Sequence, residues 1–153
     1  MPTHSKKGRG ALSNQTGRFE QHMKEDFDDG WDDPDKFPPK IPTQLFVDTA
    51  KSVITYNQSP DVGFDRSINP YRGCEHGCVY CFARPSHAYL GLSPGLDFET
   101  KLFYKPDAPE LLKAELLAKH YRPAPIALGI NTDAYQPIER QLKVTRRILE
   151  VLH

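Results

Sequence analysis

Apolar residues are distributed unevenly along the chain, and their pattern changes near residue 45. Residues 1–44 contain few apolar side chains and show no helical or strand period; this segment is basic first, then acidic, and ends in prolines. Such a segment buries too little apolar surface to offset the conformational entropy lost on ordering. We therefore predict a disordered tail over residues 1–44 and a folded domain over residues 45–153.

Two features of this tail are candidates for contacts with other molecules or with the folded domain. The aromatic residues Phe27, Trp31 and Phe37 are candidates for docking. The basic end, which contains Lys6 and Arg9, is a candidate for binding a partner or nucleic acid. Because the acidic middle offsets these positive charges, the pattern favours a solvated tail over a binding arm.

Beyond residue 44, short apolar runs alternate with segments rich in glycine and proline. β-Branched and aromatic residues predict extended segments at residues 45–47, 52–56 and 67–69. Residues 79–90 are a candidate helix despite Pro85. These elements are too short to identify a fold by themselves.

A regular alternation of strands and helices follows. Residues 98–104 predict a strand, Pro109 suits the first position of a helix over residues 110–120, and residues 125–130 are an apolar run short enough for a buried strand. A second helix is expected from residue 137 or 138. Its apolar stripe consists of Val144, Ile148, Val151 and Leu152. This order predicts an α/β fold with a parallel sheet and right-handed crossovers.

The last predicted helix is still amphipathic where the sequence stops, at His153. Two or three β/α units cannot close a barrel, which takes roughly 200 residues or more. We therefore expect the chain to be the N-terminal portion of a longer protein.

Composition narrows the classes of protein that fit. The chain has 153 residues, of which 38% are hydrophobic and 26% charged, with 20 basic and 20 acidic side chains. Zero net charge argues against a polybasic nucleic-acid binder. No apolar run approaches the ~18 residues of a membrane span, and no apolar segment follows the basic N-terminus as in a signal peptide. We expect a soluble, cytoplasmic protein.

The strongest chemical signal is a cluster of cysteines. Cys74, Cys78 and Cys81 are the only cysteines, and their C-x3-C-x2-C spacing places them within eight residues. Three thiolates this close can bind three corners of a cubane iron–sulfur cluster, and Gly73 and Gly77 allow the tight turns that such a loop needs. Because a fourth cysteine is absent, one iron would lack a protein thiolate, as is typical of catalytic metal sites.

This triplet, with the aromatic Tyr80 directly before the third cysteine, resembles the signature of radical S-adenosylmethionine (radical SAM) enzymes. The resemblance implies a [4Fe-4S] cluster held by Cys74, Cys78 and Cys81, with S-adenosylmethionine on the fourth iron and Tyr80 near the adenine. It further implies that one electron from the cluster cleaves the sulfonium, and that the resulting 5′-deoxyadenosyl radical abstracts a hydrogen atom from a substrate. The substrate itself stays unknown.

The resemblance extends over roughly residues 50–150. The runs INPYRGCEHGCVYCFARP, LDFETKLFYKP, NTDAYQPIE and TRRILEVL are similar to bacterial radical SAM proteins related to spore photoproduct lyase, or "DNA repair photolyase". A Ser/Thr-Asp pair of that lyase lies near the amino end of S-adenosylmethionine, which implies this role for Thr132 and Asp133. The additional cysteine that the lyase uses as a hydrogen donor has no counterpart here, where Ile130 and Asn131 stand.

The same resemblance implies a fold, partners and a location. The fold would be a partial (β/α) barrel of the radical SAM type. The partners would be S-adenosylmethionine and an electron donor of the flavodoxin or ferredoxin kind. Nucleic acid is a possible substrate that the net charge does not indicate, and no membrane is expected.

Other interpretations of these residues stay open. His76 or His87 could complete a Cys3His zinc site in a non-catalytic interaction module, although zinc sites more often use two separated cysteine pairs. A cluster used only for electron transfer would normally have a fourth cysteine. Arg72 and Arg84 could compensate cluster charge, hold a substrate phosphate or be surface residues. Glu139 could orient S-adenosylmethionine, but we favour a role at a helix N-terminus.

Overall fold

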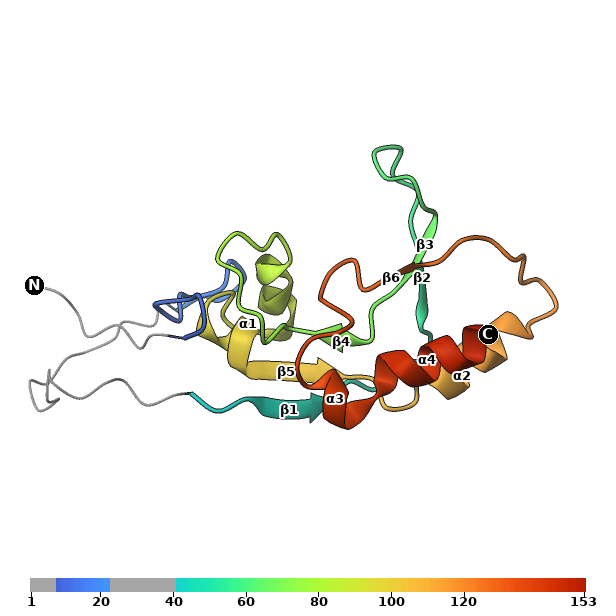
Figure 1. The fold of residues 1–153 in the computed structure, drawn as a ribbon. Helices are drawn as coiled ribbons and strands as arrows, with labels where there is room; N and C mark the ends of the chain where they lie inside the picture. The colour runs from blue at the N-terminus through green and yellow to red at the C-terminus, as the bar shows by residue number, and fades with distance from the viewer. Residues whose placement is uncertain (1–7, 23–40) are drawn as a thin grey trace, which may run out of the picture. The chain divides into compact units, whose positions relative to one another are not determined.

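The computed structural model describes residues 8–22 and 41–153 as a mixed α/β arrangement of short elements (Figure 1). In chain order these are β1 (Gln44–Val47), β2 (Ile54–Tyr56), β3 (Arg66–Ile68), β4 (Tyr71–Arg72), the 3-10 helix η1 (Arg84–Leu90), α1 (Leu96–Thr100), β5 (Lys101–Tyr104), α2 (Ala108–Leu116), β6 (Ala127–Leu128), α3 (Glu139–Leu142) and α4 (Val144–Leu152). The extended segments predicted at residues 45–47, 52–56 and 67–69 are confirmed as β1, β2 and β3.

The chain forms two compact units. The first, here called the cysteine-loop unit, includes residues up to Gln44 and Gly73–Leu102. The second, the sheet–helix unit, consists of Leu45–Arg72 and Phe103–His153. Each unit therefore combines segments that are far apart in the sequence.

Strand pairing in the sheet–helix unit differs from the single parallel sheet that the sequence predicts. Two three-stranded sheets form, in the orders β1-β5-β4 and β2-β3-β6. Strands β3 and β6 pair in parallel, whereas β2–β3 and β4–β5 are antiparallel. The two strands expected to be neighbours, β5 and β6, thus belong to different sheets. A hydrophobic pattern indicates where a strand forms but does not specify its partner.

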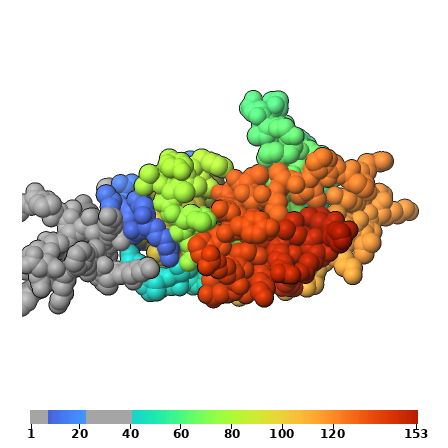
Figure 2. Space-filling view, viewed as in Figure 1, coloured from blue at the N-terminus to red at the C-terminus, as the bar shows by residue number. Residues whose placement is uncertain are grey.

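The hairpin of β2 and β3 is in register from Ile54 opposite Ile68 to Tyr56 opposite Arg66. Its connecting loop projects from the surface as a green protrusion (Figure 2). At the loop end of the strand pair, the guanidinium of Arg66 lies 5.5 Å from the ring centroid of Tyr56 and 5.7 Å from that of Tyr121. This stacking gives the short hairpin an attachment to the rest of its unit.

Helix α2 begins as predicted, with Pro109 in its first turn, but it ends at Leu116 instead of at residue 120. Leu112 is fully buried, whereas Leu117, just past the end of the helix, is 76% exposed. No burial therefore supports a further turn of helix beyond Leu116.

The second predicted helix is broken into α3 and α4. Lys143 adopts a left-handed conformation, with φ of 53°, between the two helices. The apolar stripe is buried at Val144 and Ile148 but is half-buried at Val151 and exposed at Leu152. The sequence shows one continuous period because lysine carries no signal for a break.

The strand predicted over residues 98–104 is wrong in its first half. Residues Leu96–Thr100 form helix α1, and the strand β5 begins only at Lys101. All five residues of α1 are buried, including the polar Asp97, Glu99 and Thr100, so polarity does not mark an exposed face and no helical period is evident. The hydroxyl of Thr100 donates to the carbonyl of Leu96, 2.7 Å away, as expected within a helical turn.

Residues 8–22 have defined partners, where the sequence predicts disorder. The amide of Leu96 donates to Ser13 O (3.2 Å), and that of Asp97 donates to Asn14 Oδ1 (3.1 Å). Polar contacts to α1 therefore order this segment, and a hydrophobic pattern cannot show such contacts. The predicted docking residues Phe27, Trp31 and Phe37 lie outside the described residues.

Helices α2 and α4 pack against each other, and Ile148 is fully buried on α4. Replacing Ile148 with valine removes one buried methylene. We expect the free energy of unfolding to fall by about 1 kcal/mol. Urea denaturation of the variant and of Leu149→Ala, whose side chain is 39% exposed, will measure this difference. An equal or larger effect at Leu149 would contradict the assignment of the buried face.

In the part of the chain that the structure describes, none of the helices has both the length and the apolar character that crossing a bilayer requires.

Candidate functional site

The three cysteines lie on one compact loop, residues 74–81, here called the cysteine loop. Its first residue is anchored to α1, since the amide of Cys74 donates to Phe98 O at 3.0 Å. Two successive turns follow, in which the amide of Gly77 donates to Cys74 O (3.3 Å) and that of Cys81 donates to Cys78 O (3.2 Å). The spacing of the motif thus corresponds to one turn between each pair of cysteines.

Two glycines fit this loop for both conformational and steric reasons. Gly73 and Gly77 have φ values of 78° and 63°, which disfavour any side chain. A Cβ atom on Gly73 would lie 2.9 Å from Phe98 O, and one on Gly77 would lie 2.6 Å from the Cβ of Arg9. The loop therefore packs closely against α1 on one side and the N-terminal segment on the other.

The three thiols differ in their surroundings. Cys74 is buried with Ala83 and Phe98, and Cys81 packs against the same cluster, whereas Cys78 is exposed. None of the three forms a disulfide. Within residues 8–22 and 41–153, no three histidine, cysteine, aspartate or glutamate side chains are gathered in a way that could hold a metal ion.

These residues fit an iron–sulfur cluster in their chemistry. Thiolates are the usual protein ligands of such clusters, and all three cysteines share a single loop. The conformation described here does not present them as a ready ligand set, because one thiol faces solvent while the other two are packed. The side chain of Tyr80, predicted to lie near adenine, is 87% exposed on the same loop.

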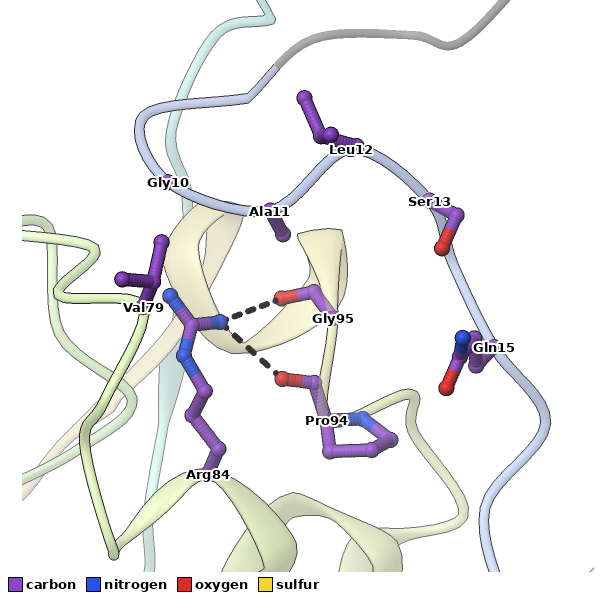
Figure 3. A pocket seen from close by; sticks show the side chains of 9 residues that line it. All are labelled: Gly10, Ala11, Leu12, Ser13, Gln15, Val79, Arg84, Pro94 and Gly95. Atoms are coloured by element: carbon purple, nitrogen blue, oxygen red, sulfur yellow. Dashed lines mark hydrogen bonds between the residues drawn. The ribbon is translucent and has the colours of Figure 1, made fainter.

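The guanidinium of Arg84 holds backbone carbonyl groups of the cysteine loop in place. It donates to the carbonyl oxygens of Gly77 (2.8 Å) and Cys78 (2.9 Å), and also to those of Pro94 and Gly95 (Figure 3). It forms an ion pair with the buried Glu99. The prediction that Arg84 is an exposed surface residue is wrong, because its side chain is only 12% exposed.

Glu99 is the centre of this polar network and is fully buried. Burial on its own would raise the pKa of the carboxyl group, but hydrogen bonds from Arg84 and from the amides of Gly10, Ala11 and Arg9 outweigh it and hold the pKa below its usual range. Glu99 is therefore ionised at neutral pH. Its role is not evident from the sequence, because a single glutamate in the mixed segment LDFETKLF carries no motif.

The two histidines considered as zinc ligands lie in different environments. His76 is exposed in the cysteine loop. His87 is fully buried, with Nε2 at 2.9 Å from Lys101 O, and its ring packs edge-on against Phe98. Burial lowers the pKa of His87 below its usual range, so the ring is neutral at pH 7. His87 therefore has a structural role in the middle of η1.

Thr132 and Asp133 belong to the sheet–helix unit and follow strand β6. This strand covers only Ala127–Leu128 and is half-buried, so the buried strand predicted over residues 125–130 is confirmed only in its middle. Thr132 is buried, and its hydroxyl donates to Tyr71 O at 2.8 Å. Asp133 is exposed, and its Oδ1 accepts from the amide of Tyr135 at 2.7 Å, which forms a local turn. In this structure both side chains therefore stabilise the segment after β6.

Arg72 and Glu139 are also engaged within the sheet–helix unit. The Nε atom of Arg72 lies 2.8 Å from Asp48, which also binds Lys105 at 3.1 Å. Glu139 is buried and accepts the amides of Thr145 (3.1 Å) and Arg146 (3.0 Å). The helix-terminus role favoured for Glu139 is thus observed, at the start of α4.

Comparison with known proteins finds relatives that cover part of the chain. Rv2578c of Mycobacterium tuberculosis, an uncharacterized protein, is 43% identical over 89 residues, which are 58% of this chain and 26% of the relative. MJ0683 of Methanocaldococcus jannaschii, also uncharacterized, is 34% identical over 83 residues, 54% of this chain and 29% of the relative. The matched region thus spans less than a third of each relative. No family model and no solved structure matches the chain.

Proposed function

We propose that this chain is part of a radical SAM protein, in which Cys74, Cys78 and Cys81 hold a [4Fe-4S] cluster and S-adenosylmethionine binds the remaining iron. The observation that carries the proposal is the cysteine loop itself. Three thiols lie on one loop of eight residues, and the chain has no fourth cysteine. When bound, the cluster would supply the electron that cleaves the sulfonium.

The residues of the cysteine-loop unit support this role in three ways. The glycines permit the tight turns that keep the three cysteines on one compact loop. The packing of Cys74 and Cys81 against Phe98 gives two thiols an apolar environment that limits access of water and oxygen. The exposed ring of Tyr80 is available for stacking on an adenine. Assembly requires a local rearrangement at Cys78.

The remaining parts of the proposal concern the whole protein. A partial (β/α) barrel, a role of Thr132 and Asp133 near S-adenosylmethionine, an electron donor of the flavodoxin or ferredoxin kind and a cytoplasmic location all follow from the resemblance. The parallel pairing of β3 with β6, and the position of Thr132 and Asp133 directly after β6, are compatible with this arrangement. The substrate that donates a hydrogen atom is not specified by these residues.

Anaerobic purification and reconstitution with iron and sulfide test the proposal. We expect about four irons per chain and a reduced-cluster electron paramagnetic resonance signal that shifts when S-adenosylmethionine is added. A cluster whose signal ignores S-adenosylmethionine would indicate electron transfer instead. Zinc in the purified chain, together with failure to take up iron, would favour the Cys3His interaction module.

A further inference from the structure

We propose that residues 8–11, here called the strap, clamp the cysteine loop in place, and that Glu99 is the positioning residue through which they do so. The strap lies in the segment expected to be disordered, about 70 residues before the loop that it contacts. This inference extends the proposed function, because it assigns a structural dependence to the same loop. It rests on three sets of contacts within the cysteine-loop unit.

The first set joins the strap to Glu99. Three successive amides donate to its carboxylate: that of Arg9 to Oε2 at 2.7 Å, that of Gly10 to both oxygens at 3.1 and 3.2 Å, and that of Ala11 to Oε1 at 2.7 Å. Successive amides that converge on one carboxylate form an anion-binding concavity. The strap therefore binds a charge contributed by α1.

The second set joins Glu99 to the cysteine loop. The same carboxylate pairs with Arg84, whose guanidinium donates to Gly77 O and Cys78 O. The guanidinium is nearly buried, at 12% exposure, so it depends on Glu99 for charge compensation. Loss of the carboxylate would leave a cation behind the loop without its partner. Displacement of Arg84 would in turn release the two carbonyls that it holds.

The third set joins the strap to the loop directly. The guanidinium of Arg9 donates to Thr43 Oγ1 (2.6 Å) and lies 3.6 Å from Glu75, the residue after Cys74. Gly10 packs on Gly77 so closely that a Cβ on Gly10 would lie 1.9 Å from Gly77 O. The space-filling view shows the blue N-terminal segment against the yellow-green residues of this unit (Figure 2).

A hollow of about 280 Å³ lies beside the strap, and residues of both the strap and the cysteine loop line it. Gly10 and Ala11 form one side, and Val79 and Arg84 form another (Figure 3). The strap thus forms a wall beside the cysteine loop. Its removal would expose the back of the loop to solvent.

The test measures how fast each thiol of the metal-free full chain is alkylated by iodoacetamide, resolved by mass spectrometry. Glu99→Gln removes the charge, and Gly10→Ala places a methyl group against Gly77 O. Both variants are expected to raise the alkylation rate of the buried Cys74 about tenfold or more. A buried thiol reacts only when the structure opens locally, and these variants lower the free energy of that opening. The exposed Cys78 serves as the internal reference, and its rate should change little.

Gly63→Ala is the matched control, since an added Cβ there meets no atom within 4 Å. Arg9→Ala, which keeps the strap's backbone contacts, is a milder variant if the other two fail to fold, as judged by far-ultraviolet circular dichroism. Unchanged Cys74 rates in the folded variants would overturn the role of the strap, even if a cluster assembles in the wild type. Faster rates support the strap even if the wild type takes up no iron, a result that would overturn only the proposed function.

Discussion

Replacing Cys78 with alanine is expected to reduce iron incorporation on reconstitution to background, because two thiolates cannot hold a cubane cluster in this loop. The same change should leave the free energy of unfolding of the metal-free chain within about 0.5 kcal/mol of wild type, since the Cys78 side chain is exposed and outside the packed cluster. Iron and sulfide analysis after anaerobic reconstitution measures the first effect, and urea denaturation measures the second.

Val79→Ala is the matched control for this loss. Val79 neighbours Cys78, is 69% exposed and has no sulfur, so its truncation should preserve iron content. Cys74→Ala should lose iron as Cys78→Ala does, with an added cost in stability because Cys74 is buried. Full iron content in Cys78→Ala would show that the ligand assignment is wrong.

The two-unit organisation explains why the fold should survive these substitutions. Cys74, Cys78 and Cys81 all lie in the cysteine-loop unit, whereas α2 and α4 pack in the sheet–helix unit. Leu112 and Ile148, which are fully buried there, do not depend on the thiols. The helical part of the far-ultraviolet signal should therefore be the same in the cysteine variants and in the wild type.

Elements with a one-sided apolar pattern and a clear boundary residue could be predicted from the sequence. Pro109 marked the start of α2, and β-branched residues marked β2. Elements without such a contrast were missed. Helix α1 is buried on every side, and after the break at Lys143 the Glu139 carboxylate accepts the amide of Thr145 in the first turn of α4. These features are set by tertiary contacts, which local patterns do not encode.

The same distinction applies to the site. The cysteine spacing and its glycines were evident, because ligand residues and turn residues recur in recognisable order. Glu99 and the strap were not, since their roles come from hydrogen bonds between residues about 90 positions apart. A polar segment such as residues 8–11 resembles a disordered tail in composition, although its backbone amides bind a buried carboxylate. Every residue except proline has a backbone amide, so a hydrophobic pattern does not show which amides donate to a buried acceptor.

Glu139 is the clearest example of a charged residue whose role the structure specifies. Its carboxylate accepts the amides of Thr145 and Arg146, which have no partner within the first turn of α4, and the hydroxyl of Tyr71 also donates to it. Tyr71 is 1% exposed, so neither side chain can exchange this contact for water. Burial, together with the hydrogen bond to Glu139, raises the pKa of Tyr71 above that of an ordinary tyrosine.

Glu139→Ala is therefore expected to lower the free energy of unfolding by about 3 kcal/mol, because it leaves three donors without an acceptor, two of them buried. Tyr71→Phe, which removes one donor only, should cost about 1 kcal/mol. Glu150→Ala is the control on the same helix. Its exposed pair with Arg146 should contribute less than about 0.5 kcal/mol. Urea denaturation at pH 7 measures all three.

The hydrogen bond between Tyr71 and Glu139 also predicts how the free energy of unfolding depends on pH. A raised pKa in the folded state means that the contribution of the Tyr71 hydroxyl is complete below pH ~10, where the unfolded phenol ionises, and declines above it. The wild type should therefore lose its advantage over Tyr71→Phe as the pH rises past this value. Glu139→Gln distinguishes this structural role from a role in binding S-adenosylmethionine. If the variant keeps full stability but abolishes the effect of S-adenosylmethionine on the reduced cluster, Glu139 contacts the cofactor, and its hydrogen bonds to α4 are secondary.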